Sequence, residues 1–282
     1  MSGWGDRLTP AQRAWAASRL PDAVLVQDMS WNLVESIVLH VRTAEGEFVV
    51  KAGDRANHHI DRELAAHPEH TAALVATGHA ARLIDADPAN RVLLLEHLPG
   101  ELVEGTDAER HPEVHRQAGA LLKRLHGTGS RVDAEYEAKT TARAVSWLDG
   151  PHRVDRETER QARRILESSP ARSVTVVPTH GDWQPRNWLV DHGTVRVIDF
   201  GRFGFRPAAT DLTRLAAQQW RGRPELEAAF LDGYGADPRD PDRWRLDALK
   251  EAIGTACWAY RVGDEAFEAQ GHRMLAEALE AF

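Results

Sequence analysis

The chain has 282 residues, which leaves room for two lobes or for one large domain. Its 42% hydrophobic and 28% charged residues are typical of a globular protein and exclude disordered, fibrous and membrane classes. The net charge of −8 argues against a nucleic-acid partner, for which a basic surface is expected. Neither a signal peptide nor a membrane span is recognisable, so we expect a cytoplasmic protein. The single cysteine, Cys257, excludes an intrachain disulfide.

The first hundred residues alternate between strand patterns and two helical patterns. Thr9-Pro10 is typical of a helix start and predicts a helix to Leu20. Apolar runs between turn residues predict strands at 23–26, 33–42, 47–51, 82–84 and 91–96, with a helix at 58–66. Leu98-Pro99-Gly100 breaks the pattern. We therefore expect a nucleotide-binding domain at residues 1–99.

After Gly100 the patterns become mostly helical. Helices are expected at 113–126, 142–148, 157–166, 225–234 and 243–282, interrupted by a hairpin between Val174 and Ile198. No internal repeat or low-complexity segment is present. We expect residues 100–282 to form one helical domain that carries the catalytic loop, the metal site and the substrate cleft.

The segment 174–201 carries the most specific chemical signal. An apolar strand leads into His180-Gly181-Asp182, the loop continues to Asn187, and a hairpin then ends at Asp199-Phe200-Gly201. Such a hairpin places Asn187 near Asp199, with Asp182 on the loop that enters it. Hard oxygen ligands in this arrangement suit Mg²⁺, which completes its shell with phosphate oxygens and water.

The spacing His-x-Asp-x-x-x-x-Asn, followed by Asp-Phe-Gly, reproduces the kinase template. In that template the first acid, here Asp182, orients the attacking hydroxyl, while Asn187 and Asp199 hold magnesium. The alternative is a loop in which Asp and His only cap turns. Phosphoryl transfer follows as a hypothesis.

These residues make the chain resemble the aminoglycoside phosphotransferase family of small-molecule antibiotic kinases. His180, Gly181, Asp182 and Asn187 match the family's catalytic loop, and Asp199 matches its metal aspartate. The resemblance implies an α+β, bilobal, protein-kinase-like fold with a small antiparallel-sheet N-terminal lobe, which contains one main helix, and a larger helical C-terminal lobe. It also implies ATP or GTP and Mg²⁺ as cofactors, and an alcohol group as phosphoryl acceptor.

The same resemblance suggests further site residues. Lys51 matches the phosphate-binding lysine and Glu63 its partner, although Asp61 could compete, and the backbone at Glu96 and Leu98 would bond adenine. The complete nucleotide site implied in this way is Lys51, Glu63, Ser30, Val49, Glu96, Leu98 and Ile198. His180 and Asp211 are expected to support the site structurally, with Asp211 at the start of the following helix.

Three departures separate the chain from protein kinases. Ser30-Trp31-Asn32 replaces a glycine-rich loop before Lys51, and no Ala-Pro-Glu follows Asp199. Gln184 stands where protein serine kinases have a lysine, which leaves Lys51 and magnesium to neutralise the phosphates. We therefore expect a small-molecule substrate and no protein partner.

Acidic and aromatic residues of the last eighty positions favour a cationic substrate, because carboxylates and ring faces both bind ammonium groups. The acids are Asp232, Asp237, Asp240, Asp242, Asp247, Asp264, Glu265 and Glu268. The alternative is that the acids are solvated or paired with arginines and that the tryptophans pack in the core. An aminoglycoside or a basic peptide antibiotic of the tuberactinomycin type is expected, and its phosphorylation would give resistance by inactivation. An uncharged antibiotic, a metabolic amino alcohol, sugar or amino acid derivative, and a non-catalytic nucleotide-binding module remain open.

Overall fold

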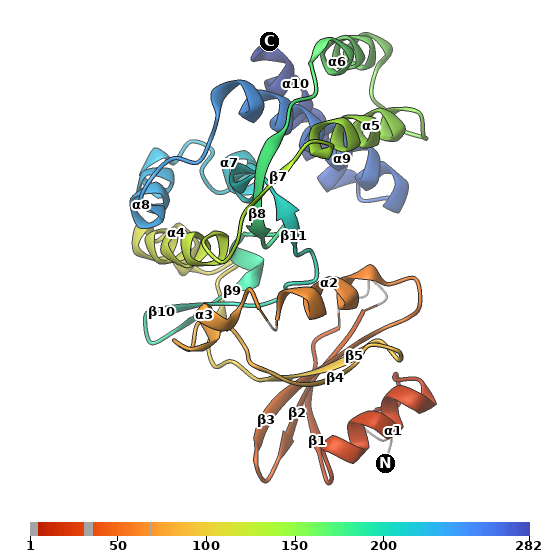
Figure 1. The fold of residues 1–282 in the computed structure, drawn as a ribbon, viewed down its shortest axis with the longest axis vertical. Helices are drawn as coiled ribbons and strands as arrows, with labels where there is room; N and C mark the ends of the chain where they lie inside the picture. The colour runs from red at the N-terminus through yellow and green to blue at the C-terminus, as the bar shows by residue number, and fades with distance from the viewer. Residues whose placement is uncertain (1–4, 31–35, 68) are drawn as a thin grey trace. The chain divides into compact units, whose positions relative to one another are not determined.

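The computed structural model describes residues 5–30, 36–67 and 69–282, and the predicted strand at 33–42 lies partly outside them (Figure 1). Contacts divide the chain into two compact units, and each unit consists of three segments. Unit 1 comprises Met1–Gly129, Pro178–Gly204 and Arg223–Gly235, and unit 2 comprises Ser130–Val177, Phe205–Gly222 and Ala236–Phe282. This division differs from the expected domains 1–99 and 100–282, because unit 1 also includes residues 100–129, the segment Pro178–Gly204 with the loop 180–187, and the segment Arg223–Gly235.

Unit 1 contains an antiparallel five-stranded sheet, as expected for the small lobe of a kinase-like α+β fold. Its strand order is β1-β2-β3-β5-β4, in which β5 lies between β3 and β4. The strands are β1 (Val24–Asp28), β2 (Ser36–Thr43), β3 (Gly46–Gly53), β4 (Leu83–Asp87) and β5 (Val92–Glu96). The two helices beside the sheet are α1 (Pro10–Arg19) and α2 (His58–Ala66).

Strand β3 alternates between the two faces of this sheet. Val50 and Ala52 pack in a buried cluster with Trp15 and Ala16 of helix α1. Val49 packs in the cluster on the opposite face, which includes Ile60 of helix α2. Because successive side chains of a strand point to opposite faces, Lys51 lies on the α2 face together with Val49 and Glu47.

A second, three-stranded sheet of unit 1 carries the predicted hairpin. Its order is β10-β9-β6, formed by β6 (Glu101–Leu102), β9 (Trp188–Asp191) and β10 (Thr194–Val197). Unit 1 also contains the helices α3 (Ala72–Val75), α4 (Pro112–His126) and α8 (Pro224–Tyr234) and the 3₁₀ helix Asp107–Arg110.

Helices α4 and α8 approach closely through two glycines. A Cβ atom on Gly119 would lie 2.1 Å from the carbonyl oxygen of Phe230, and one on Gly233 would lie 1.8 Å from that of Arg116. Only glycine fits at either position. The hydroxyl of Tyr234, at the end of α8, also lies 2.8 Å from Nδ1 of His126 at the end of α4.

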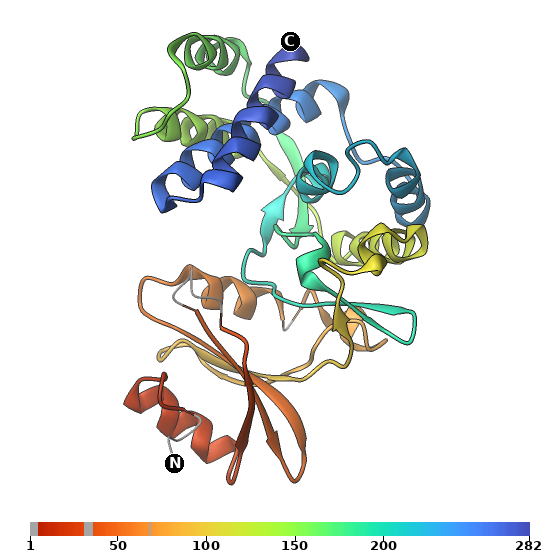
Figure 2. The same ribbon diagram turned by 180° about the vertical axis from the view of Figure 1, so that it is seen from behind.

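Unit 2 is mainly helical (Figure 2). It contains α5 (Tyr136–Leu148), α6 (Arg156–Ser168), the 3₁₀ helix Ala208–Leu212, α7 (Thr213–Ala217), α9 (Pro241–Val262) and α10 (Glu265–Glu280). Strand β7 (Arg131–Asp133) pairs with β8 (Val174–Thr179), whose last two residues belong to unit 1, and β11 (Gly204–Arg206) completes that sheet.

The single helix predicted over 243–282 is wrong, because two helices occupy this range. Gly263 ends helix α9 in the left-handed conformation with φ 77°, and Asp264 caps helix α10 by accepting the amide hydrogen of Phe267. Both helices contribute to one buried core with α5 and α6. Among the described residues, no helix is long and apolar enough to cross a membrane.

Candidate active site

The loop between β8 and β9 is fixed by the core of unit 1. Gly181 adopts φ 80°, a conformation that favours glycine, and the loop ends in the 3₁₀ helix Pro185–Asn187. Trp183 and Trp188 are almost fully buried, with their ring centroids 6.2 Å apart. Two large buried aromatic side chains that follow Asp182 therefore hold residues 180–187.

The Asp182 carboxylate is buried and accepts hydrogen bonds on both oxygens. Its Oδ1 accepts from Nε2 of Gln184 at 2.5 Å. Its Oδ2 accepts from Nη2 of Arg186 at 2.6 Å and from Nδ2 of Asn187 at 3.1 Å. These bonds fix the direction of the carboxylate.

Arg186 was not singled out in the sequence, where only Lys51 and magnesium were expected to neutralise the phosphates. The structure places its guanidinium on Asp182, and Nε of Arg202 lies 3.9 Å from the same oxygen. Two cationic side chains therefore lie at the Asp182 carboxylate. The signal in the sequence was an arginine four residues after Asp182.

Asn187 uses its side-chain amide group within the loop. Nδ2 donates to the carbonyl oxygen of Asp182 at 2.8 Å, so Oδ1 is the atom that could coordinate a cation. The amide of Ile198 donates to the carbonyl oxygen of Asn187 at 3.0 Å. The hairpin thus brings Asn187 beside the residue that precedes Asp199, in the way the sequence pattern predicts.

Asp199 has a strained backbone with φ 65°, which is uncommon for a residue other than glycine and typical of functional sites. Its Oδ1 accepts from Nζ of Lys51 at 3.2 Å. Desolvation by the surrounding side chains would by itself raise the pKa of this carboxyl, but the positive charge of Lys51 lowers it overall. A Cβ atom on Gly201 would come within 3.1 Å of the same oxygen. The Asp199 carboxylate is thus charged near pH 7. It also leaves little space for a residue larger than glycine at position 201.

Lys51 joins Asp199 to Glu63. Its Nζ donates to the two carboxylate oxygens of Glu63 at 2.8 and 2.9 Å. Burial alone would lower the pKa of Lys51, but the charges of Asp199 and Glu63 raise it overall. The competing candidate, Asp61, instead pairs with Arg91 at 3.2 Å. The structure therefore selects Glu63 as the partner of Lys51.

His180 has a supporting position. Its imidazole is fully buried, packs against the rings of Trp183 and Phe200, and donates from Nε2 to the carbonyl oxygen of Ile198 at 3.0 Å. Asp211 is also buried, but it lies in the 3₁₀ helix Ala208–Leu212 of unit 2, and the N-cap of α7 is Leu212. Its position as a helix cap is therefore not observed, and its support of the catalytic loop stays a prediction.

The remaining nucleotide candidates lie along the five-stranded sheet. Ser30 closes the end of strand β1, because its Oγ accepts from the amide of Val38 at 2.9 Å. The neighbouring Trp31 and Asn32 lie outside the described residues. Val49 and Leu98 belong to the apolar cluster on the α2 face, which would cover a flat base.

The backbone at the end of strand β5 and just after it forms hydrogen bonds with two different segments of unit 1. The amide of Glu96 donates to the carbonyl oxygen of Arg82, and the amide of His97 donates to that of Glu47, both at 3.0 Å. Adenine contacts of Glu96 and Leu98 remain a prediction.

Asn187 and Asp199 fit a magnesium ion in their donor chemistry. Both can offer oxygen atoms, and the side chain of Asp199 is 52% exposed although its neighbours are largely buried. A carboxylate and an amide oxygen are ligands that Mg²⁺ accepts beside phosphate oxygens.

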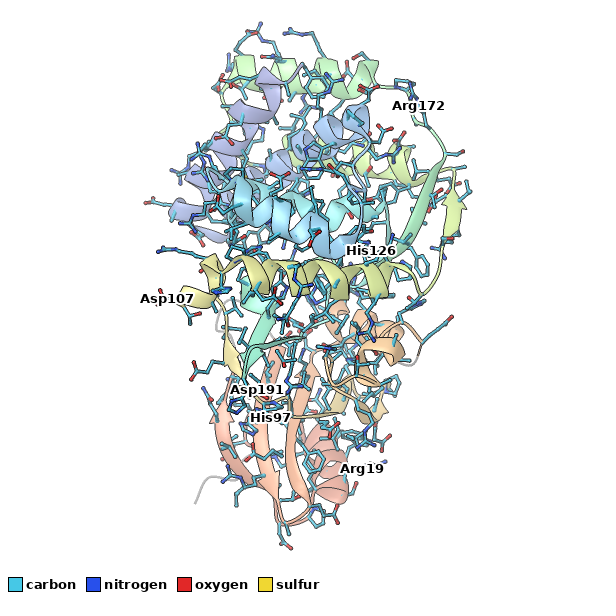
Figure 3. All side chains as sticks on the ribbon, turned by 90° about the vertical axis from the view of Figure 1, so that its left-hand side faces the viewer. Arg19, His97, Asp107, His126, Arg172 and Asp191 are labelled. Atoms are coloured by element: carbon cyan, nitrogen blue, oxygen red, sulfur yellow. The ribbon has the colours of Figure 1, made fainter. Side chains whose placement is uncertain are left out.

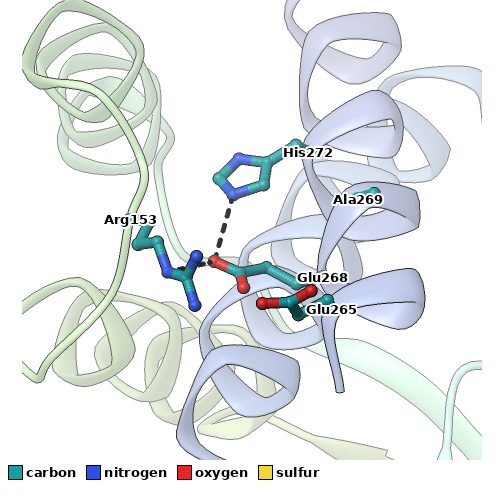
Figure 4. A pocket seen from close by; sticks show the side chains of 5 residues that line it. All are labelled: Arg153, Glu265, Glu268, Ala269 and His272. Carbon is teal, nitrogen blue, oxygen red and sulfur yellow. Dashed lines mark ion pairs between the residues drawn. The ribbon is translucent and has the colours of Figure 1, made fainter. Parts of the chain in front are cut away.

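A hollow of 330 Å³ belongs to unit 2 and is lined by none of the residues expected to bind nucleotide or metal or to transfer the phosphoryl group (Figure 4). Its lining residues are Arg153, Glu265, Glu268, Ala269 and His272. The buried Glu268 carboxylate lies 3.5 Å from Nε of Arg153 and 3.5 Å from Nε2 of His272. The pair with Arg153 joins α10 to the segment before α6, and the contact with His272 lies within α10.

Three features together define a kinase-like phosphotransferase. They are the lysine–glutamate pair between a sheet and a helix, the loop aspartate with its asparagine, and the strained aspartate that follows the hairpin. The comparison with protein families is consistent with this class. The model described as "Phosphotransferase enzyme family" matches residues 34–246, and the chain belongs to this family. It is thus a phosphotransferase with an alcohol group as acceptor.

Solved structures share the fold at low sequence identity. A thermostable mutant of aminoglycoside phosphotransferase APH(4)-Ia, in complex with ADP and hygromycin B, has a TM-score of 0.70 at 15% identity, covering 97% of this chain and 99% of that one. Choline kinase LicA from Streptococcus pneumoniae has a TM-score of 0.70 at 13% identity, with coverages of 96% and 98%. Macrolide 2'-phosphotransferase MphH from Brachybacterium faecium has a TM-score of 0.57 at 15% identity, with coverages of 95% and 98%. No curated protein matches the sequence.

Proposed function

We propose that the protein transfers the γ-phosphoryl group of ATP to a hydroxyl of a cationic antibiotic, an aminoglycoside or a basic peptide antibiotic, and so gives resistance by inactivation. The observation that carries the phosphoryl transfer is the arrangement in unit 1. Lys51 bridges Glu63 and Asp199, while Asp182 is oriented by its own loop. A nucleotide-binding module without turnover would have no need for the oriented Asp182.

Asp182 would orient the acceptor hydroxyl and accept its proton late in the reaction. A free hydroxyl is a weak nucleophile, and phosphoryl transfer depends mainly on positioning and on neutralising charge. The hydrogen bonds from Gln184, Arg186 and Asn187 hold the direction of this carboxylate. The arrangement therefore supports an orienting role for Asp182.

Lys51 would bind phosphate oxygens of the nucleotide. Glu63 holds its ammonium group in place, and the raised pKa keeps that group charged throughout the physiological range. When bound, magnesium would neutralise charge on the phosphates, and Asn187 and Asp199 are the residues that would hold it. The guanidinium of Arg186 adds a positive charge close to Asp182.

A buried carboxylate in unit 2 supports a cationic acceptor. Oδ2 of Asp247, on helix α9, is buried without a hydrogen-bond partner in the described part of the chain. Burial raises the pKa of this group to about 6, against the lowering effect of Lys250 and Arg243. Several other acids of the region are neutralised locally, since Asp237 binds Arg239, Asp242 binds Arg245, and Asp240 and Asp264 cap helices. Asp247 is therefore the acid with the most to gain from a bound ammonium group.

A metabolic amino alcohol kinase is the second candidate, and the similarity of the fold to choline kinase LicA favours it. An amino alcohol also joins a cationic nitrogen to a hydroxyl, so the same residues would serve it. The two functions differ in the size of the acceptor.

The test is a screen of the purified chain with ATP or GTP and Mg²⁺. Aminoglycosides, tuberactinomycins, macrolides, choline, ethanolamine and neutral sugars are offered separately, and mass spectrometry detects the phosphate adduct. Phosphorylation of an aminoglycoside or a basic peptide supports the proposal, and the Asp182→Asn variant serves as the inactive control. Turnover of choline alone would favour the second candidate, and turnover of a neutral sugar alone would overturn the cationic acceptor.

The salt dependence of KM gives a second test of acceptor charge. Electrostatic capture weakens with ionic strength, because the Debye length falls from about 10 Å at 0.1 M to about 3 Å at 1 M. With saturating ATP and fixed magnesium, KM for the accepted substrate should rise with salt. A KM that does not change with salt would contradict electrostatic capture and leave the phosphotransfer chemistry intact.

A further inference from the structure

Two histidines and a glutamate meet on three neighbouring strands of unit 1, outside the residues assigned to phosphoryl transfer. Their potential ligand atoms, in His40, Glu47 and His97, all lie within 4.8 Å of one another. Within the described residues, this is the one group of at least three histidine, cysteine or acidic side chains with such spacing.

The strand register explains why these side chains converge. In the β2–β3 pair, Arg42 lies opposite Glu47 and His40 lies opposite Val49, so His40 is the diagonal neighbour of Glu47. His97 follows strand β5 directly, and its amide donates to the carbonyl oxygen of Glu47 at 3.0 Å. The three side chains thus share the sheet face that carries Lys51. His97 is labelled in Figure 3.

The contacts within the cluster centre on one carboxylate oxygen. Oε2 of Glu47 lies 2.9 Å from Nε2 of His40 and 3.6 Å from Nδ1 of His97. The two imidazole rings stack in parallel with centroids 3.8 Å apart and an interplanar angle of 3°. His40 is 7% exposed. Two nitrogen donors and one oxygen donor therefore lie within 4.8 Å of one another on one face of the sheet.

Arg42 holds the glutamate in the required direction. Its Nε and Nη2 donate to Oε1 of Glu47 at 2.7 and 2.6 Å, which turns Oε2 toward the histidines. The hydrogen bond from Arg42 also lowers the pKa of Glu47, and burial lowers the pKa of His97. The cluster thus presents an ionised carboxylate and, at His97, an imidazole that is neutral near pH 7. These are the forms that bind a metal ion.

From this geometry we propose that His40, Glu47 and His97 form a binding site for a transition-metal cation, with Zn²⁺ as the preferred ion. Imidazole nitrogens and one carboxylate oxygen are ligands that zinc takes at 2.0–2.2 Å, and three protein ligands leave a fourth position for water. A hydrogen bond to the second oxygen of a ligating carboxylate is the usual outer contact of such sites, and Arg42 supplies it. Magnesium prefers an all-oxygen shell and does not suit this donor set.

The competing explanation is a purely structural network in which Glu47 accepts hydrogen bonds from both histidines. Metal binding without nucleotide separates the two, and it does so whether or not the phosphotransfer proposal holds. The full chain, stripped with a chelator, is titrated with Zn²⁺ against a chromophoric chelator in excess Mg²⁺, which occupies oxygen-ligand sites. Co²⁺ is added in parallel, because its visible absorption reports nitrogen ligands and a low coordination number.

The wild-type chain should bind one equivalent of zinc. His97→Gln and Glu47→Gln should each weaken that binding at least tenfold and remove the cobalt absorption, since each removes one ligand. The matched control is His192→Gln in the β9–β10 turn, where the ring is 98% exposed, and it should bind zinc like the wild type. His97 is more exposed than His40, so its replacement is the less disruptive one, and circular dichroism checks that the variant is folded. Equal zinc affinity in the wild type and His97→Gln, or no stoichiometric binding by the wild type, would overturn the proposal.

Discussion

The loop 180–187 of unit 1 and the α5–α9 helix pair of unit 2 both bury carboxylates, but they supply them with different numbers of hydrogen-bond donors. In the loop, Asp182 accepts bonds from three side chains that follow it within five residues. In the helix pair, Glu137 accepts from Arg243 and from the amide of Arg172, both at 2.5 Å, whereas Oδ2 of Asp247 has no hydrogen-bond partner in the described part of the chain.

This difference has an energetic meaning. A buried carboxylate with a complete set of donors is stable in its charged form, whereas one without donors retains an unfavourable desolvation cost. The loop is thus organised before any ligand arrives. The helix pair keeps a carboxylate that a cationic ligand would satisfy, and the following predictions test each side of this comparison.

The largest effect is expected at Asp182. Asp182→Asn removes the proposed proton acceptor with little change in side-chain volume, so nucleotide binding should persist while kcat falls about 10² to 10⁴-fold. Isothermal titration with a non-hydrolysable nucleotide and turnover of the accepted substrate measure the two quantities. A turnover close to that of the wild type would refute the assignment.

The proposed metal ligands should come next. Asp199→Asn removes a negative charge from the proposed metal site and an ion-pair partner of Lys51, so kcat/KM should fall about 10²-fold or more. Asn187→Ala should lose less and should be partly rescued by higher magnesium, because it removes a neutral ligand. Magnesium titrations of both variants provide the measurement. Unchanged magnesium dependence in both would place the metal elsewhere.

Arg186 provides a test of how much its hydrogen bond contributes to the orientation of Asp182. Arg186→Ala removes a charge-assisted bond of about 1.5–3 kcal/mol, which corresponds to about a 10- to 100-fold loss of kcat. Arg186→Lys should recover part of this loss because it restores the charge without the two-pronged contact. Arg160→Ala, at an exposed surface pair with Glu157, is the matched control and should act like the wild type. An active Arg186→Ala would show that Asp182 is oriented by Gln184 and Asn187 alone.

The smallest effect is expected at Asp247, where a substitution should increase stability. Its folded-state pKa of about 6 exceeds the ordinary value of 3.8. Between these two values the unfolded chain ionises at this group before the folded chain does, and this lowers the free energy of unfolding. Stability from this group is complete below about pH 4 and is lost as the pH rises toward 6, by up to about 3 kcal/mol.

Asp247→Asn should therefore raise the free energy of unfolding at pH 7 by about 1–3 kcal/mol, and this gain should shrink at pH 4–5. Urea unfolding at both pH values measures it, with the exposed Asp242→Asn as control. The same variant should raise KM for a cationic acceptor, a trade of activity against stability. A less stable Asp247→Asn at pH 7 would show that the carboxylate has a stabilising partner in the fold.

The sequence predicted the local elements well, because apolar periodicity and cap residues determine them over short distances. The helix at 58–66 has the predicted bounds, and the hairpin after Asn187 is formed as expected. The break at Gly263 was readable as a glycine followed by a capping aspartate, but continuous apolar spacing on both sides hid it. Asp182, Asn187 and Asp199 could be proposed from spacing.

Other features depend on long-range pairing and could not be predicted. The convergence of His40, Glu47 and His97 requires the β2-β3-β5 strand order and its register. The choice of Glu63 over Asp61 required the direction of each side chain on helix α2. Arg186 was visible in the loop, but its contact with Asp182 depends on the tight turn that the buried tryptophans impose.

The close contact of α4 with α8 through Gly119 and Gly233 has a consequence for how the chain is made. Helix α8 belongs to unit 1, yet it is synthesised after the first two segments of unit 2. At about 5–20 residues per second, α4 leaves the ribosome several seconds before the helix that covers its glycine face. Unit 1 therefore cannot be completed while the chain is still short, and a nascent chain that stops before Arg223 would present an uncovered surface to chaperones and proteases.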